Sequence, residues 1–71
     1  MMVAIITQEQ KDLLVGMKYD NIQYFNPIQD LNGNWVISQE EIDNCIMVDC
    51  MWVKDLTLST FNPPIYNDPF I

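Results

Sequence analysis

The chain has 71 residues, of which 49% are hydrophobic, and ten Asp and Glu face three Lys with no His, so that the formal net charge is −7. A chain of this length holds one domain with a thin core, and its apolar content excludes a disordered acidic tail. Direct nucleic-acid binding is not expected, because it depends on basic side chains that neutralise phosphates. The lysines, Lys11, Lys18 and Lys54, are dispersed and form no basic patch for an anionic membrane.

The first six residues, Met1 to Ile6, form an apolar run with no charged segment before it. This run is far shorter than a signal-peptide core or a membrane span, so we expect a cytoplasmic protein without membrane contact. The two cysteines, Cys45 and Cys50, can form one disulfide at most, whereas small secreted domains usually carry more. Packing as buried, reduced thiols is therefore the favoured interpretation.

The first predicted helix begins after Thr7. The run Thr7-Gln8-Glu9-Gln10 has the form of a capping box, in which the side chains of the first and last residues each bond the other's backbone amide. Gly16 is placed to end this helix in the left-handed conformation. Its apolar stripe consists of Leu13, Leu14 and Met17.

A β-hairpin is predicted next. Residues 22–29 are rich in strand-forming side chains, and Pro27 indicates an edge strand or a bulge because it lacks a backbone donor. Asn32-Gly33 is a strong signal for a two-residue type I′ turn, in which both residues have positive φ. Such a turn pairs Ile28 with Ile37. The predicted core face carries Ile22, Tyr24, Ile28, Trp35 and Ile37.

The second predicted helix begins after Ser38, since Ser38-Gln39-Glu40-Glu41 is another capping box. Its inner stripe is expected to contain Ile42, Cys45 and Ile46. Residues 47–58 either prolong this helix or turn into a further strand, because short apolar runs are ambiguous by periodicity. We favour the turn and strand.

Residues 61–71 differ from the rest in carrying three prolines and no helical or strand pattern. The sequence thus predicts a small single α+β domain over residues 1–60, built as helix, β-hairpin, helix and a third strand, followed by an extended Pro-rich arm over residues 61–71. The arm's large apolar side chains form a patch that monomers rarely expose, so we expect them either to contact a partner protein or a second copy, or to fold back over the chain's own sheet and complete its core. These partner-binding residues are Phe61, Ile65, Tyr66, Phe70 and Ile71.

No catalytic residue, metal ligand or cofactor is predicted, and we expect the protein not to be an enzyme. Without His, the commonest general base is missing and a cysteine nucleophile lacks its usual activating group. Glu40 and Glu41 are explained as a negatively charged helix start. Two thiols without His cannot complete a zinc site.

Residues 30–41 match one metal-binding pattern, the EF-hand calcium loop, through their oxygen-bearing residues. Trp35 stands where that loop needs Gly, and Pro27 interrupts the segment that would be its first helix. A hairpin followed by a capping box explains the same residues without a metal, and calcium binding stays an alternative. The oxygen ligands of such a loop would be Asp30, Asn32, Asn34, Ser38 and Glu41.

Three runs of the sequence, Tyr24 to Asp30, Gly33 to Glu41 and Trp52 to Leu56, resemble small uncharacterised accessory proteins of tailed bacteriophages of gut bacteria. The likeness covers about Thr7 to Tyr66 and brings no family function with it. It implies a context: a minor virion component, or an early factor that binds host machinery. The sequence therefore predicts a non-catalytic protein-binding or assembly protein, with an acidic nucleic-acid mimic that inhibits a host protein as a further alternative.

Overall fold

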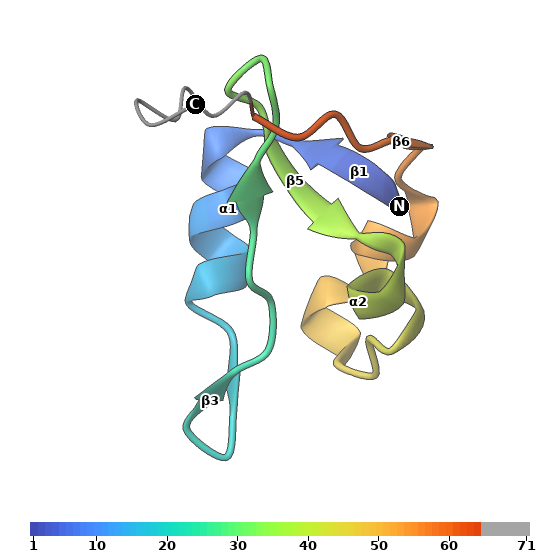
Figure 1. The fold of residues 1–71 in the computed structure, drawn as a ribbon. Helices are drawn as coiled ribbons and strands as arrows, with labels where there is room; N and C mark the ends of the chain where they lie inside the picture. Colours follow the sequence, from blue (N-terminus) through green and yellow to red (C-terminus); the bar gives the residue numbers. More distant parts are fainter. Residues whose placement is uncertain (65–71) are drawn as a thin grey trace.

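The structure, a computed structural model, describes residues 1–64 (Figure 1). It is a single α+β domain, as the sequence predicts. In chain order its elements are β1 (Met2–Ile6), α1 (Gln8–Val15), β2 (Lys18–Tyr19), β3 (Ile22–Gln23), β4 (Ile28–Gln29), β5 (Trp35–Ser38), α2 (Gln39–Asp43), the 3-10 helix η1 (Val48–Asp55) and β6 (Leu58–Thr60).

The main sheet has four strands in the order β4-β5-β1-β6, and all its neighbouring pairs are antiparallel. The strand β1 pairs with β5 on one side, where Ala4 faces Ile37, and with β6 on the other, where Ala4 faces Leu58. The apolar run Met1 to Ile6, to which the sequence analysis assigned no element, is therefore a central strand. Pro27 precedes β4 at the edge of this sheet, where its missing donor leaves no ladder bond unmade.

The core lies between one face of this sheet and the helices, which Figure 1 shows on the same side. Phe25, which precedes β4, is the largest fully buried side chain. The indole of Trp35 donates to Gln8 Oε1 at 3.0 Å and lies under the Lys11 ammonium, which joins β5 to α1. The buried core cluster consists of Ala4, Ile6, Leu14, Phe25, Ile37, Ile42, Cys45, Cys50 and Val53.

Both predicted capping boxes are confirmed. The Gln10 amide donates to Thr7 Oγ1 at 3.1 Å and the Glu41 amide to Ser38 Oγ at 3.2 Å, with the reciprocal bonds also present. The left-handed end predicted for the first helix is wrong. Gly16 has φ −75° and continues the right-handed turn, with its amide bonded to the carbonyls of the preceding turn.

The predicted hairpin forms between β4 and β5, but its register is shifted by one residue. Ile28 faces Val36 instead of Ile37, and the loop has three residues instead of two. Only Gly33 has positive φ, at 79°, and it follows a turn closed by its own amide on the carbonyl of Asp30. The Asp30 carboxylate favours this longer loop because it accepts the amides of Asn32 and Asn34, each at 2.9 Å.

The shifted register changes which side chains are buried, because a one-residue slip moves a strand's side chains to the opposite face. Ile37 lies in the core as predicted, whereas Ile28 is exposed. The strand predicted over residues 22–29 is also divided, and its first part pairs with β2. That hairpin turns at Asp20 and Asn21, whose φ values are 52° and 64°. Within residues 1–64, the two positive φ values that a type I′ turn requires are therefore found here and not at Asn32-Gly33.

Three further expectations about side chains and elements are corrected. Leu13 is exposed, because α1 turns only Leu14 fully inward. The helix α2 ends at Asp43, so Ile46 falls outside it and is exposed. Residues 48–55 form η1 instead of a strand, and the third strand follows later as β6.

The segment after β6 returns to the domain. The Phe61 amide donates to the Met1 carbonyl at 2.9 Å, and the Asn62 carbonyl accepts the Leu31 amide at 2.8 Å. The predicted boundary between domain and arm lies after residue 60. The next two residues, Phe61 and Asn62, are still bonded to the sheet and to the β4–β5 loop. Within residues 1–64 no helix has the length and apolarity that crossing a membrane requires.

Candidate protein-contact site

The partner-binding residues predicted in the arm are only partly described. Phe61 is half-buried, and its backbone extends the ladder between β1 and β6. The other four, Ile65, Tyr66, Phe70 and Ile71, lie outside the described residues. The arm as a contact site stays a prediction.

The carboxylate of Asp30, first in the calcium-loop pattern, is turned toward its own loop. It is 8% exposed, and besides the two backbone amides it accepts the side-chain amide of Asn34 at 3.4 Å. The last residue of the pattern, Glu41, caps α2 with one oxygen and accepts the Asn26 amide with the other at 2.8 Å. The oxygens at both ends of the pattern are therefore engaged in holding the fold.

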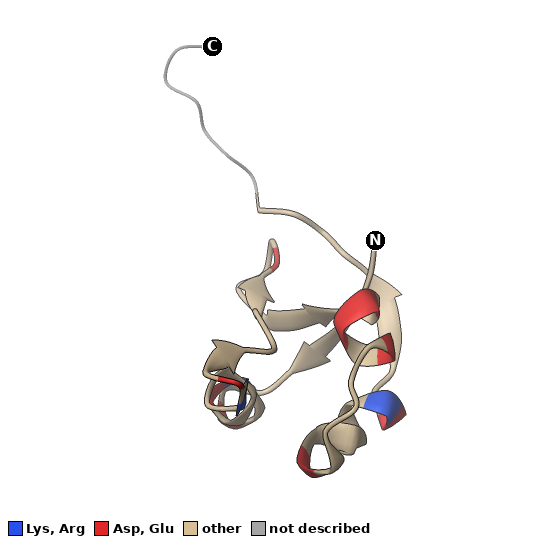
Figure 2. Ribbon diagram, turned by 90° about the horizontal axis from the view of Figure 1, so that it is seen from below, with Lys and Arg blue, Asp and Glu red and all other residues tan. Residues whose placement is uncertain are grey.

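The carboxylates give no sign of a paired acid–base site in the described residues. Glu41 is committed to Ser38 and Asn26, while its neighbour Glu40 is exposed on the first turn of α2. Figure 2 shows Asp and Glu on α1, at the β4–β5 loop and on α2 and η1, spread around the domain. A nucleic-acid mimic, the alternative from the sequence, would need its carboxylates on one face, and it stays a prediction.

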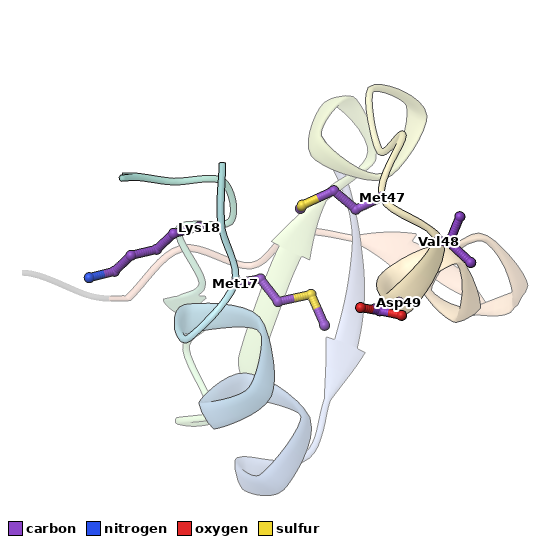
Figure 3. A pocket seen from close by; sticks show the side chains of 5 residues that line it. All are labelled: Met17, Lys18, Met47, Val48 and Asp49. Carbon is purple, nitrogen blue, oxygen red and sulfur yellow. The ribbon is translucent and has the colours of Figure 1, made fainter. Parts of the chain in front are cut away.

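The feature that the sequence analysis missed is a pocket of about 290 Å³ between the start of β2 and the start of η1 (Figure 3). Met17 and Lys18 line one side, and Met47, Val48 and Asp49 line the other. In Figure 3 the Met47 side chain extends from the η1 side toward the segment of Met17, while the Lys18 ammonium points away. Two of the five lining residues are therefore methionines, and Lys18 and Asp49 add one charged group on each side.

Backbone hydrogen bonds hold both walls of this pocket. The Met17 carbonyl accepts the Tyr24 amide at 3.3 Å, and the Tyr24 hydroxyl donates to the Asn44 carbonyl at the end of α2. The Met47 carbonyl accepts the Cys50 amide at 3.1 Å in the first turn of η1. Tyr24 thus connects the Met17 wall to the end of α2, from which the chain continues to Met47, and the pocket is a preformed part of the domain.

Large apolar side chains are exposed next to the pocket. Val48, in its wall, is 86% exposed, and Ile46, one residue before Met47, is 73% exposed. On the other side the β2–β3 hairpin carries Tyr19 and Ile22, which are 59% and 71% exposed. Exposed large apolar side chains are typical of protein-contact sites when they gather into one patch.

No sequence signal specified this pocket. Met17 was expected in the stripe of the first helix, and Met47 and Val48 fell in the run whose periodicity was ambiguous. Both methionines pack partly against the core, which is why an apolar pattern alone cannot separate pocket wall from core. Only the approach of two segments far apart in the chain creates the site.

Comparisons with protein-family models, with curated proteins and with solved structures found no match. The fold and the geometry of the site therefore carry the functional argument by themselves.

Proposed function

We propose that this protein is a non-catalytic protein-binding module whose partner inserts one large apolar side chain into the pocket between Met17 and Met47. The observation that carries the proposal is the 86% exposure of Val48 in the wall of a preformed, methionine-lined pocket. Methionine is flexible and polarisable, and it adapts to apolar side chains of different shapes. A volume of about 290 Å³ lies at the lower limit of small-molecule pockets, which suits one side chain better than a cofactor.

The charge of the chain indicates what surrounds that apolar side chain in the partner. The net charge is −7, and the pocket is lined by one acidic side chain, Asp49, and by Lys18, whose ammonium points away from the pocket. Lysine or arginine beside the inserted residue would complement this charge and accelerate association. The proposed ligand is therefore a protein segment with a Leu, Met or Phe next to basic residues.

A displayed library of random peptides tests this directly, with the full chain as bait. We expect enrichment of peptides that combine a large apolar residue with neighbouring Lys or Arg. Val48→Ser should weaken a selected peptide about tenfold in calorimetry, because burial of a Val side chain is worth about 1.5–3 kcal/mol and only part of it is lost. Leu13→Ser is the matched control, since Leu13 is also exposed but lies on α1, outside the pocket lining.

Two results would contradict the proposal. One is a selection without any enriched peptide, and the other is a peptide that Val48→Ser and Leu13→Ser weaken equally. Both side chains are exposed in the free protein, so neither variant should change the unfolding midpoint appreciably.

The arm predicted from the sequence is tested separately by ending the chain at Pro64. This truncation removes Ile65, Tyr66, Phe70 and Ile71 but keeps the backbone bonds of Phe61 and Asn62. If the arm contributes to contact, the shortened chain keeps its circular dichroism spectrum and loses partner binding or self-association in light scattering. Unchanged association would remove the arm from the proposed contact.

The wider context of the proposal comes from the resemblance to phage accessory proteins. The module would act in the host cytoplasm or in the virion, on a host protein or on a second copy of itself. A calcium-dependent function would instead raise the melting temperature in millimolar calcium relative to EDTA. We expect no such rise, because the Asp30 carboxylate already bonds two loop amides.

A further inference from the structure

The two cysteines, which the proposed function does not use, lie in direct contact in the core. Cys45 Sγ and Cys50 Sγ are 2.9 Å apart, and the residues are 3% and 0% exposed. Both thiols are free. They also converge on one acceptor, the Met47 carbonyl, at 3.8 Å from Cys45 Sγ and 3.3 Å from Cys50 Sγ.

The native backbone determines this proximity. The Cys45 amide bonds the Ile42 carbonyl at 3.2 Å at the end of α2, and the Cys50 amide bonds the Met47 carbonyl at the start of η1. Each sulfur is therefore carried by a hydrogen-bonded helical turn. The backbone just before Cys45 is held further by the Tyr24 hydroxyl, which donates to the Asn44 carbonyl.

We infer that Cys45 and Cys50 form a reversible dithiol–disulfide site that a low-molecular-weight disulfide such as oxidised glutathione can oxidise. One protein thiol gives its proton to solvent and attacks the small disulfide, which forms a mixed disulfide and releases one small thiolate. The second protein thiol then loses its proton and attacks the mixed disulfide, which releases the other small thiolate. In total, two protein thiols lose two electrons and two protons, and one small disulfide becomes two small thiols.

The surroundings of the two sulfurs suggest the order of these steps. Burial, together with the neighbouring Cys45 thiol, raises the pKa of the Cys50 thiol to about 11. Little Cys50 thiolate is therefore present at neutral pH. Cys45, which is 3% exposed whereas Cys50 is fully buried, is assigned the first attack, and Cys50 resolves the mixed disulfide. Because both residues are buried, the exchange requires a local opening of the segment between α2 and η1 and proceeds slowly.

The ring closed by this disulfide contains Met47, Val48 and Asp49, which form one wall of the pocket. Oxidation therefore joins the two ends of the segment that carries this wall. The inference itself rests on the contact between the sulfurs and does not depend on the proposed binding function.

The test compares the folded and unfolded chain in glutathione buffers of fixed composition. After acid quenching, the intramolecular disulfide is measured by mass spectrometry. It is recognised as a monomer that is two hydrogen atoms lighter than the dithiol form and whose two cysteines are not alkylated. We expect the ratio of disulfide to dithiol to be at least tenfold higher in native buffer than in unfolding urea, because the fold already brings the sulfurs together. By thermodynamic linkage, oxidation then shifts the folding equilibrium by the same factor, which urea unfolding of the two forms measures independently.

Cys45→Ala and Cys50→Ala serve as controls that cannot form the bond and should show only mixed disulfides. The unmodified chain supplies the decisive ratio, so the result does not depend on how well these variants fold. An equal or smaller ratio in native buffer, or an oxidised form that unfolds more easily than the reduced one, would overturn the inference.

Discussion

The two β-hairpins of this domain are built in opposite ways. The β4–β5 hairpin has a loop closed by the buried Asp30 carboxylate, and β5 pairs with the central strand. The β2–β3 hairpin has only two paired residues on each strand, turns at two non-glycine residues with positive φ, and exposes Tyr19 and Ile22. The first holds the sheet together, whereas the second lies beside the candidate contact site, so stability and contact are assigned to different hairpins.

The largest expected effect that separates the hairpins is that of Asp30→Ala. This change removes the acceptor of two backbone amides and one side-chain amide in a nearly buried position. Hydrogen bonds to charged groups contribute about 1.5–3 kcal/mol each at most and are not additive, so we expect a loss of about 2–3 kcal/mol in urea unfolding. Asp20→Ala, at the turn of the other hairpin, is the comparison and should cost less than 1 kcal/mol, since Asp20 is exposed.

Asp30→Asn separates the effect of the charge from that of the hydrogen-bond acceptor, because it keeps an oxygen acceptor of the same shape without the charge. It should lose less than half as much stability as Asp30→Ala. If the two variants unfold at the same urea concentration, the loop is not held by this side chain, and the comparison between the hairpins fails.

An intermediate effect is expected from the two glycines. Gly33 has φ 79°, so Gly33→Ala forces a side chain into the left-handed region and should cost about 1 kcal/mol although the site has open space. Gly16 has φ −75°, and an added Cβ there meets only ordinary contacts at 3.5 Å. Gly16→Ala should therefore be neutral or stabilise by about 0.5 kcal/mol, since Ala restricts the unfolded chain. Equal changes in unfolding midpoint would show that one of the two conformations is wrong.

The smallest expected effect lies at the turn of the β2–β3 hairpin. Asn21 has φ 64°, and glycine adopts this region without steric cost. Asn21→Gly should leave the global unfolding free energy within about 0.5 kcal/mol while it increases protection of the Tyr24 amide in hydrogen exchange, because that bond follows directly on the hairpin. A global change above 1 kcal/mol would mean that this hairpin carries the fold as the other one does.

The parts of this fold that could be predicted from the sequence are local. Each capping box involves residues three apart, and the hydrogen bonds that it specifies form within one turn, so both helix starts were predicted correctly. The Asn32-Gly33 pair located a hairpin, but it did not fix the register. The side chain of Asp30 selected a three-residue loop, which the dipeptide signal does not include.

The parts that could not be predicted depend on segments far apart in the chain. Nothing within the run Met2–Ile6 indicates that it lies between β5 and β6, because short apolar runs carry no information about their partners. The contact site is non-local in the same way. Met17 and Met47 have ordinary helical and apolar surroundings in the sequence, and they form a pocket only when β2 and η1 come together.

The central position of β1 has a consequence for synthesis on the ribosome. Residues 2–6 are made before both of their partner strands, one of which begins at Trp35 and the other at Leu58. The sheet therefore closes only after Thr60 has emerged, and Ile5 and Ile6 have no hydrogen-bonded neighbours until their partners in β5, Val36 and Trp35, have emerged. Such long-range pairing slows folding and leaves an unpaired apolar strand open to aggregation or to chaperones. The nascent chain thus passes through a vulnerable stage that ends when β6 docks beside β1.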